Sequence, residues 1–181
     1  DEIREVIKES KKSVEDVKRR HEEAKRESER SLKEIRELAE EVKERLRDLL
    51  RRIRKLVKDG VDEKTLEELL RRIEELLKRI KDRLDEMLER NRELIKKISD
   101  DSERLLRDNE RLIRDIERKV KDEEVRRRLR KIHKEAEERL RRANDELRKL
   151  HEEIKKTVEK IKRELDKIVE EIERDVRRDR K

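Results

Sequence analysis

Apolar and small side chains recur at alternating spacings of four and three residues along nearly the whole chain, and this repeat constrains the fold more than any other feature. A spacing of this kind is the seam of a coiled-coil helix. Further apolar residues widen the stripe, which suits a helix with two neighbours. In the first helical stretch the seam reads Ile3, Ile7, Ser10, Val14, Val17, His21, Ala24, Ser28, Ser31, Ile35, Leu38 and Val42.

Two interruptions divide the repeat into three helices. The first contains Gly60, which suits the left-handed position after a helix, and Asp62, which suits the N-cap of the next helix. The second follows Val120, where Asp122 is a candidate N-cap and no glycine is present. We therefore predict one domain over residues 1–181, with helices at about 2–58, 63–120 and 123–179. Short turns make neighbouring helices antiparallel, so we expect a single-chain up-down-up three-helix bundle.

One segment allows another interpretation. The residues from Ser99 to Glu103 could form a turn with a fresh N-cap. Cutting the helix there would leave helices of unequal length, so the register of the seam favours a continuous helix.

The composition excludes several kinds of protein. Charged residues make up 62% of the chain and hydrophobic residues 29%, without any Phe, Trp, Tyr, Cys or Pro. The 60 Lys and Arg are interspersed with 53 Asp and Glu, as on a solvated helix surface. Without a basic patch or an aromatic to stack on a base, we expect no nucleic-acid partner. No apolar run is long enough to span a bilayer, no signal peptide is visible, and localisation stays open.

Polar residues replace apolar ones in the seam at three heights. In an up-down-up bundle, residues level with one another on two helices have numbers that add up to a constant. By this rule each height combines one His, one Asn and a Ser-x-x-Ser pair. The predicted layers are Ser10, Ser13, Asn109 and His133, then His21, Ser99, Ser102 and Asn144, then Ser28, Ser31, Asn91 and His151.

These layers could form complete hydrogen-bond networks, because the side chains supply both donors and acceptors. A histidine in every layer indicates titration near neutral pH. If burial opposes protonation, acid destabilises the bundle, and three histidines together cost roughly 6 kcal/mol at about pH 5. An alternative is an inert scaffold in which the polar layers only specify helix pairing.

Other chemistry has little support in the sequence. Successive layers are about 15 Å apart at the helical rise, so a shared metal site is not expected. There is no glycine-rich phosphate loop and no nucleophile beside a base. We expect no enzyme activity, no small-molecule substrate, no metal and no cofactor.

The idealised Glu, Lys, Arg, Leu and Ile helices, with His21, His133 and His151 in the seam, resemble a known family across the whole chain. This family comprises de novo designed pH-responsive helical bundles with buried histidine hydrogen-bond networks. The resemblance implies that acid opens the bundle at endosomal pH and exposes amphipathic faces that disrupt membranes. An anionic membrane surface is then the expected partner in acid. Three long helices can close a bundle alone, so we expect a monomer.

Overall fold

The computed structural model describes residues 2–178, which form three long helices. These are α1 (Glu2–Lys58), α2 (Glu63–Lys119) and α3 (Glu123–Arg178). Helix α2 ends one residue before the expected position, and the expected end of α3 at residue 179 lies outside the described residues. Helix α2 is continuous through Ser99 and Ser102, both of which face inward and are buried. The alternative turn in this segment is therefore not formed.

The turn between α1 and α2 is set by Gly60. Its φ of 81° is the left-handed conformation, which glycine adopts without steric cost. The Val61 amide donates to the Leu56 carbonyl (3.1 Å), and the Gly60 amide donates to the Val57 carbonyl (3.2 Å). This pair of bonds is the Schellman motif. Asp62 Oδ1 accepts from the Lys64 amide (3.2 Å), which caps the start of α2.

The turn between α2 and α3 has no glycine, and an arginine takes over the role of capping the carbonyls. The Arg126 side chain donates from Nε to the Val120 carbonyl (2.8 Å) and from Nη2 to the Glu117 carbonyl (2.7 Å). Cationic side chains at the end of a helix can satisfy its last carbonyls in this way. Asp122 Oδ1 accepts from the Glu124 amide (3.0 Å) and caps α3.

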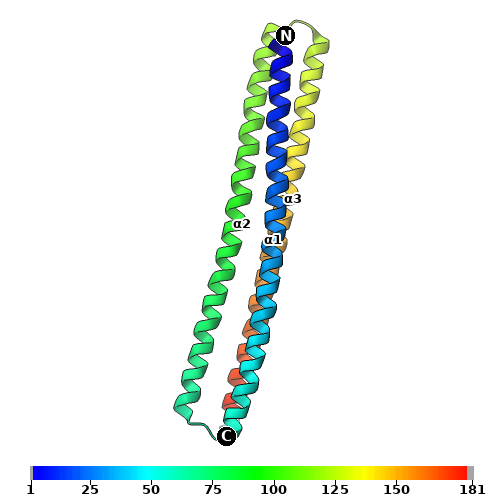
Figure 1. The fold of residues 1–181 in the computed structure, drawn as a ribbon. Helices are drawn as coiled ribbons and strands as arrows, with labels where there is room; N and C mark the ends of the chain where they lie inside the picture. Colours follow the sequence, from blue (N-terminus) through cyan, green and yellow to red (C-terminus); the bar gives the residue numbers. More distant parts are fainter. Residues whose placement is uncertain (1, 179–181) are drawn as a thin grey trace. The chain divides into compact units, whose positions relative to one another are not determined.

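The helices are packed in two compact units, of which unit 1 comprises residues 2–29 and 91–152. Ser102 contacts His21, and Asn91 contacts Ser28, so the numbers fall along α2 as they rise along α1. These two helices are therefore antiparallel. Lys25 pairs with Glu146 (3.7 Å), and this pair joins parallel stretches of α1 and α3. Figure 1 shows this part of α1 in blue, with green α2 and yellow α3 beside it.

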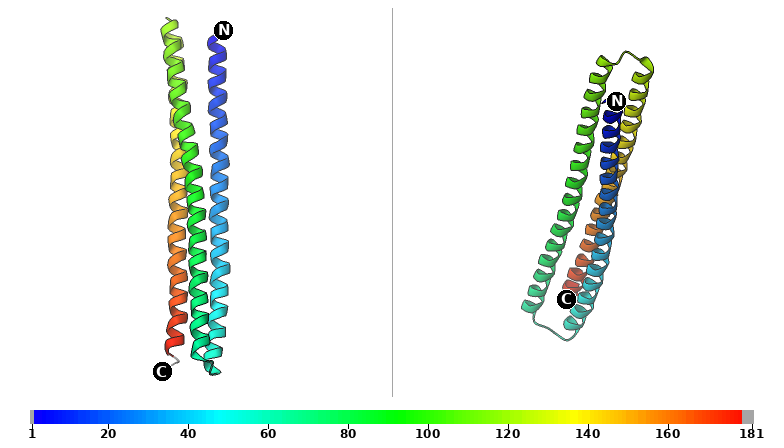
Figure 2. Two further views of the ribbon diagram at one scale, coloured as in Figure 1. Left: turned by 90° about the vertical axis from the view of Figure 1, so that its left-hand side faces the viewer. Right: turned by 45° about the horizontal axis from the view of Figure 1, so that its top comes forward.

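Unit 2 comprises residues 30–90 and 153–178 and repeats the topology. Its core is aliphatic, with Ile35, Leu84 and Leu165 fully buried. Cross-helix ion pairs join α3 to α1 at Arg36 and Glu153 (3.6 Å) and α3 to α2 at Lys81 and Asp166 (2.5 Å). The views in Figure 2 follow the same three helices through this unit. The predicted fold class, an up-down-up three-helix bundle, is confirmed.

Candidate functional site

All seven buried polar residues of the described part of the chain belong to unit 1. Three of them contact a histidine ring, namely Asn91, Ser102 and Asn144. Ser28, Asn91 and His151 form the clearest chain, called here the His151 network. The Ser28 hydroxyl donates to Asn91 Oδ1 (2.6 Å), and Asn91 Nδ2 donates to His151 Nδ1 (2.9 Å). One residue from each helix thus contributes one link. Nδ1 accepts a bond here, so the network matches a ring that carries no proton on Nδ1.

Ser31 was expected in the same layer. It belongs to unit 2, where it is half-buried, and its hydroxyl makes no hydrogen bond to a described residue. Ser28, one turn earlier, is fully buried and supplies the donor to Asn91. One hydroxyl is sufficient for the single remaining acceptor of the amide.

His21 is the most enclosed of the three histidines, and both of its ring nitrogens face oxygen. Nδ1 lies 2.8 Å from the Val17 carbonyl oxygen, and Nε2 lies 2.5 Å from Asn144 Oδ1. Carbonyl and amide oxygens only accept, so this pair of contacts matches a ring protonated at both nitrogens. A neutral ring keeps both contacts only if the Asn144 amide is reversed. The geometry at His21 is therefore the opposite of that in the His151 network.

The two serines of the His21 layer behave differently. The Ser102 hydroxyl donates to the Ile98 carbonyl (2.9 Å) and lies 3.2 Å from His21 Nε2, from which it can accept. Ser99 Oγ is buried and has no hydrogen-bond partner among the described residues. The expectation that Ser99 joins this network is wrong. Ser102 and Asn144 already occupy Nε2, and Ser99 lies one turn away from it.

His133 does not join the predicted layer with Ser10, Ser13 and Asn109. Its Nε2 lies 3.0 Å from Glu110 Oε2 and 3.9 Å from Glu137 Oε2, while Nδ1 is buried without a partner among the described residues. A protonated His133 forms an ion pair with these carboxylates. These two carboxylates can therefore accommodate a positive charge on the ring.

The expected contact fails because height along the bundle is not the same as direction around the helix. His133 shares its turn of the α3 seam with Ile132, and although its side chain is only 10% exposed, its Nε2 lies against Glu110 and not against Asn109. Asn109 faces the centre of unit 1 and is 6% exposed, whereas its neighbour Glu110 lies at the flank. Ser10 and Ser13 are half-buried and make no hydrogen bond to His133. The hydrogen-bond network predicted for this layer is therefore not formed around His133.

A cluster of carboxylates and Arg130, which the sequence analysis missed, surrounds His133. Arg130 Nη1 donates to Glu110 Oε1 (2.7 Å), and its Nε and Nη2 donate to the two oxygens of Glu117 (2.5 and 2.9 Å). The hydrogen bond from Arg130 is the main cause that lowers the pKa of Glu110, and a charged His133 lowers it further. Stability from Glu110 is therefore lost only when the pH falls below the usual carboxyl range. Glu and Arg are too abundant in this sequence for this cluster to stand out.

No other kind of site is visible in the described part of the chain. Among residues 2–178, no group of three or more His, Asp or Glu side chains is arranged to hold a metal ion. None of the three helices, within their described bounds, is long and apolar enough to cross a membrane.

Comparisons with known proteins do not identify a family for this chain. No protein-family model matches the chain, and no curated protein is similar to it in sequence. One similar solved structure is described as a "Computationally designed three helix bundle". It is 22% identical, with a TM-score of 0.47, and the match covers 98% of this chain and 88% of that chain. The fold and the sites described above depend on the chain's own contacts.

Proposed function

We propose that this chain is a monomeric, non-enzymatic helical bundle that responds to acid through the His151 network. The observation that carries the proposal is the bond from Asn91 Nδ2 to His151 Nδ1 (2.9 Å). A proton on Nδ1 places two donors face to face. The Asn91 amide can reverse to relieve this, and Nδ2 then donates to the Ser28 hydroxyl, whose proton loses the acceptor that it has at 2.6 Å. Acid therefore either removes the bond between Asn91 and His151 or forces both the Asn91 amide and the Ser28 hydroxyl to reorient.

The size of this effect follows from linkage. An ordinary imidazole titrates near pH 6.5, and a histidine held neutral costs about 1.4 kcal/mol for each pH unit below that value. Keeping His151 fully neutral at pH 5 therefore costs at most about 2 kcal/mol. Domains are stable by about 5 to 15 kcal/mol, so this cost loosens the region around the network without unfolding the bundle. In sequence, Glu27 and Glu29 flank Ser28, Arg90 and Arg92 flank Asn91, and Glu152 follows His151.

His21 and His133 should add little to the acid destabilisation, which is therefore smaller than three equivalent layers would give. His21 faces two oxygens, and His133 faces Glu110 and Glu137. Protonation of either ring leaves its contacts with acceptors intact. We therefore expect an acid response nearer to that of one histidine than to the roughly 6 kcal/mol of three.

We further propose that the bundle disrupts membranes in acid. Loosening around the His151 network frees apolar stripes whose flanks are rich in Lys and Arg, and such faces can lie in a bilayer interface. Formal net charge also rises from +7 to +10 if all three histidines are protonated. We expect leakage of dye from anionic liposomes to rise between pH 7.4 and 5 and to be weaker for His151→Asn. Background leakage at pH 5 would refute membrane disruption while leaving the conformational response to stand.

An inert scaffold is the second candidate, and the contacts of His21 and His133 favour it because both rings tolerate protonation. Urea melts at pH 7.4 and pH 5 of the parent, His151→Asn and His133→Asn separate the two candidates. The pH-responsive bundle predicts that His151→Asn removes most of the acid destabilisation, by about 2 kcal/mol, and that His133→Asn does not. If His151→Asn retains the parent's full acid sensitivity, groups other than His151 cause the response, and if the parent shows no acid sensitivity, the scaffold interpretation is correct.

A further inference from the structure

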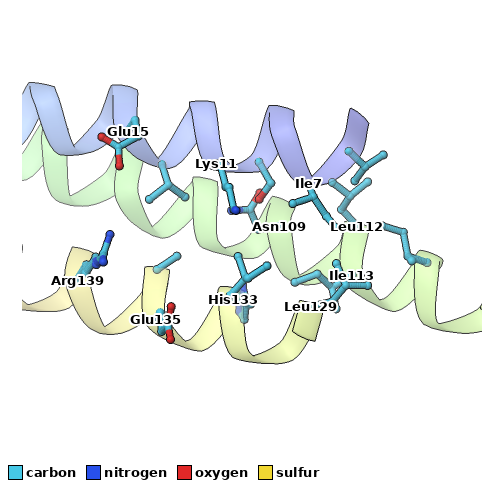
Figure 3. Close-up of a pocket in the computed structure, with 16 residues that line it drawn as sticks. Ile7, Lys11, Glu15, Asn109, Leu112, Ile113, Leu129, His133, Glu135 and Arg139 are labelled. Atoms are coloured by element: carbon cyan, nitrogen blue, oxygen red, sulfur yellow. The ribbon is translucent and has the colours of Figure 1, made fainter. Parts of the chain in front are cut away.

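A cavity of about 390 Å³ lies within unit 1, near the start of α1. All three helices contribute to its wall, which is mainly aliphatic. Figure 3 shows Ile7, Leu112 and Leu129 toward one end of the cavity. Pockets that bind small molecules have volumes of about 300 to 1,000 Å³ and are lined mostly by apolar side chains with a few polar groups. The size and lining of this cavity match that description.

Asn109 is the polar group that gives the cavity its chemistry. The residue is 6% exposed, lines the cavity, and its side-chain amide makes no hydrogen bond to any described residue. Its amide atoms are not among the buried side-chain atoms without a partner, so water reaches them through the cavity, and a ligand donor or acceptor can replace that water. The Ser10 hydroxyl lines the same cavity from α1 and is likewise without a hydrogen bond to a described residue. An amide and a hydroxyl can together receive and donate bonds to a single ligand hydroxyl.

The charges around the cavity favour an uncharged ligand. Two cations and two anions line it, namely Lys11, Arg139, Glu15 and Glu135, together with His133, whose charge when protonated is paired with Glu110. In Figure 3, Glu15, Glu135 and Arg139 lie toward the side opposite the aliphatic end, with Asn109 between the two groups. Balanced charges give no net attraction for an ion, whereas the aliphatic end excludes one.

We infer that this cavity binds a compact, uncharged alcohol or phenol whose apolar body fills the aliphatic end and whose hydroxyl pairs with Asn109. An apolar cavity of about 150 Å³ holds benzene, so a volume of about 390 Å³ accommodates a two-ring molecule. This binding site is separate from the His151 network and does not depend on the proposed pH response.

The test uses 2-naphthol and, as a matched ligand without the hydroxyl, naphthalene. The chain contains no Phe, Trp or Tyr, so the fluorescence of either probe is read without a protein background. We expect saturable one-to-one binding of 2-naphthol, roughly tenfold tighter relative to naphthalene than partitioning into an apolar solvent predicts. Asn109→Leu should weaken 2-naphthol binding by about tenfold and leave naphthalene binding unchanged or stronger.

A second pair of variants tests the place of binding. Ala136 lines the cavity, and Ala39 is a similarly buried alanine in unit 2 that does not. Ala136→Leu should abolish binding of both probes, whereas Ala39→Leu should preserve it. If Ala136→Leu fails to fold, the Asn109→Leu result alone decides. Absence of binding, equal behaviour of both probes in Asn109→Leu, or equal loss in the two alanine variants would each overturn the inference.

Discussion

Unit 1 and unit 2 are built from the same three helices but enclose different chemistry. Unit 1 contains all of the buried polar side chains among the described residues, two of them in the His151 network, together with the cavity beside Asn109. Unit 2 has an aliphatic interior and cross-helix ion pairs on its surface. Ion pairs on exposed side chains contribute at most about 1 kcal/mol each, so unit 2 is stabilised mainly by burial of apolar surface. Under the proposed function, stability and sensitivity to acid therefore lie in separate stretches of one helical repeat.

Removing a buried side chain from the core of unit 2 should lower the free energy of unfolding more than any other change considered below. Leu165 is fully buried, so Leu165→Ala leaves a cavity and should lower the free energy of unfolding by about 2 to 5 kcal/mol in urea melts at pH 7.4. Leu76, which is 37% exposed in the same unit, is the matched control, and Leu76→Ala should cost less than about 1 kcal/mol. Similar costs for the two substitutions would show that unit 2 is not packed as described.

The next effect comes from making unit 1 resemble unit 2. Replacing the whole His151 network through Ser28→Ala, Asn91→Leu and His151→Leu removes both partners of each of its two hydrogen bonds together. We expect stability at pH 7.4 to be unchanged or increased, by up to about 4 kcal/mol, and the acid destabilisation at pH 5 to fall by about 2 kcal/mol. Urea melts at both pH values measure this.

Ser28→Ala alone is the control for that experiment. It leaves Asn91 Oδ1 without its donor, which should cost about 1 to 3 kcal/mol at pH 7.4, and it frees the Asn91 amide to turn toward a protonated His151, so the acid destabilisation should fall. If the triple variant keeps the parent's acid response, then groups outside the His151 network cause it.

The helices and their register could be predicted from the sequence, whereas the directions of several side chains could not. The repeat and Gly60 determine the helices and the first turn, because each depends on local spacing or conformation. Height along the bundle follows from the same register, and Ser28, Asn91 and His151 meet accordingly. Direction around the helix does not follow, since it depends on which of two neighbours, such as Ile132 and His133, occupies the centre. The capping of the last α2 carbonyls by Arg126 could not be predicted either, because it depends on the direction in which the side chain points.

A small effect of opposite sign is expected in unit 2. Glu173 has its pKa raised above the usual value, first by the hydrogen bond with Glu74, then by burial and by repulsion from the Glu74 charge. A raised carboxyl pKa penalises the charged form, so the penalty is present at neutral pH and disappears as the pH falls through that pKa. Unit 2 should gain a few tenths of a kcal/mol on acidification, since solvent screens this partly exposed pair.

Glu74→Gln tests this pair. The variant should show the gain already at pH 7.4 and should then change less between pH 7.4 and 5 than the parent. Melts of the two proteins at both pH values give the comparison. A variant that is less stable than the parent at neutral pH would contradict a penalty from like charges.

Amide hydrogen exchange at pH 7.4 and pH 5, corrected for the intrinsic pH dependence of exchange, locates the acid response along the three helices. The His151 network predicts that protection falls first around Ser28, Asn91 and His151, by an amount equivalent to about 2 kcal/mol, while amides around Leu46 and Leu165 in unit 2 stay protected. The same measurement on His151→Asn should show no selective loss. Protection that falls evenly in both units, or that falls around the network equally in His151→Asn, would contradict the assignment of the acid response to His151.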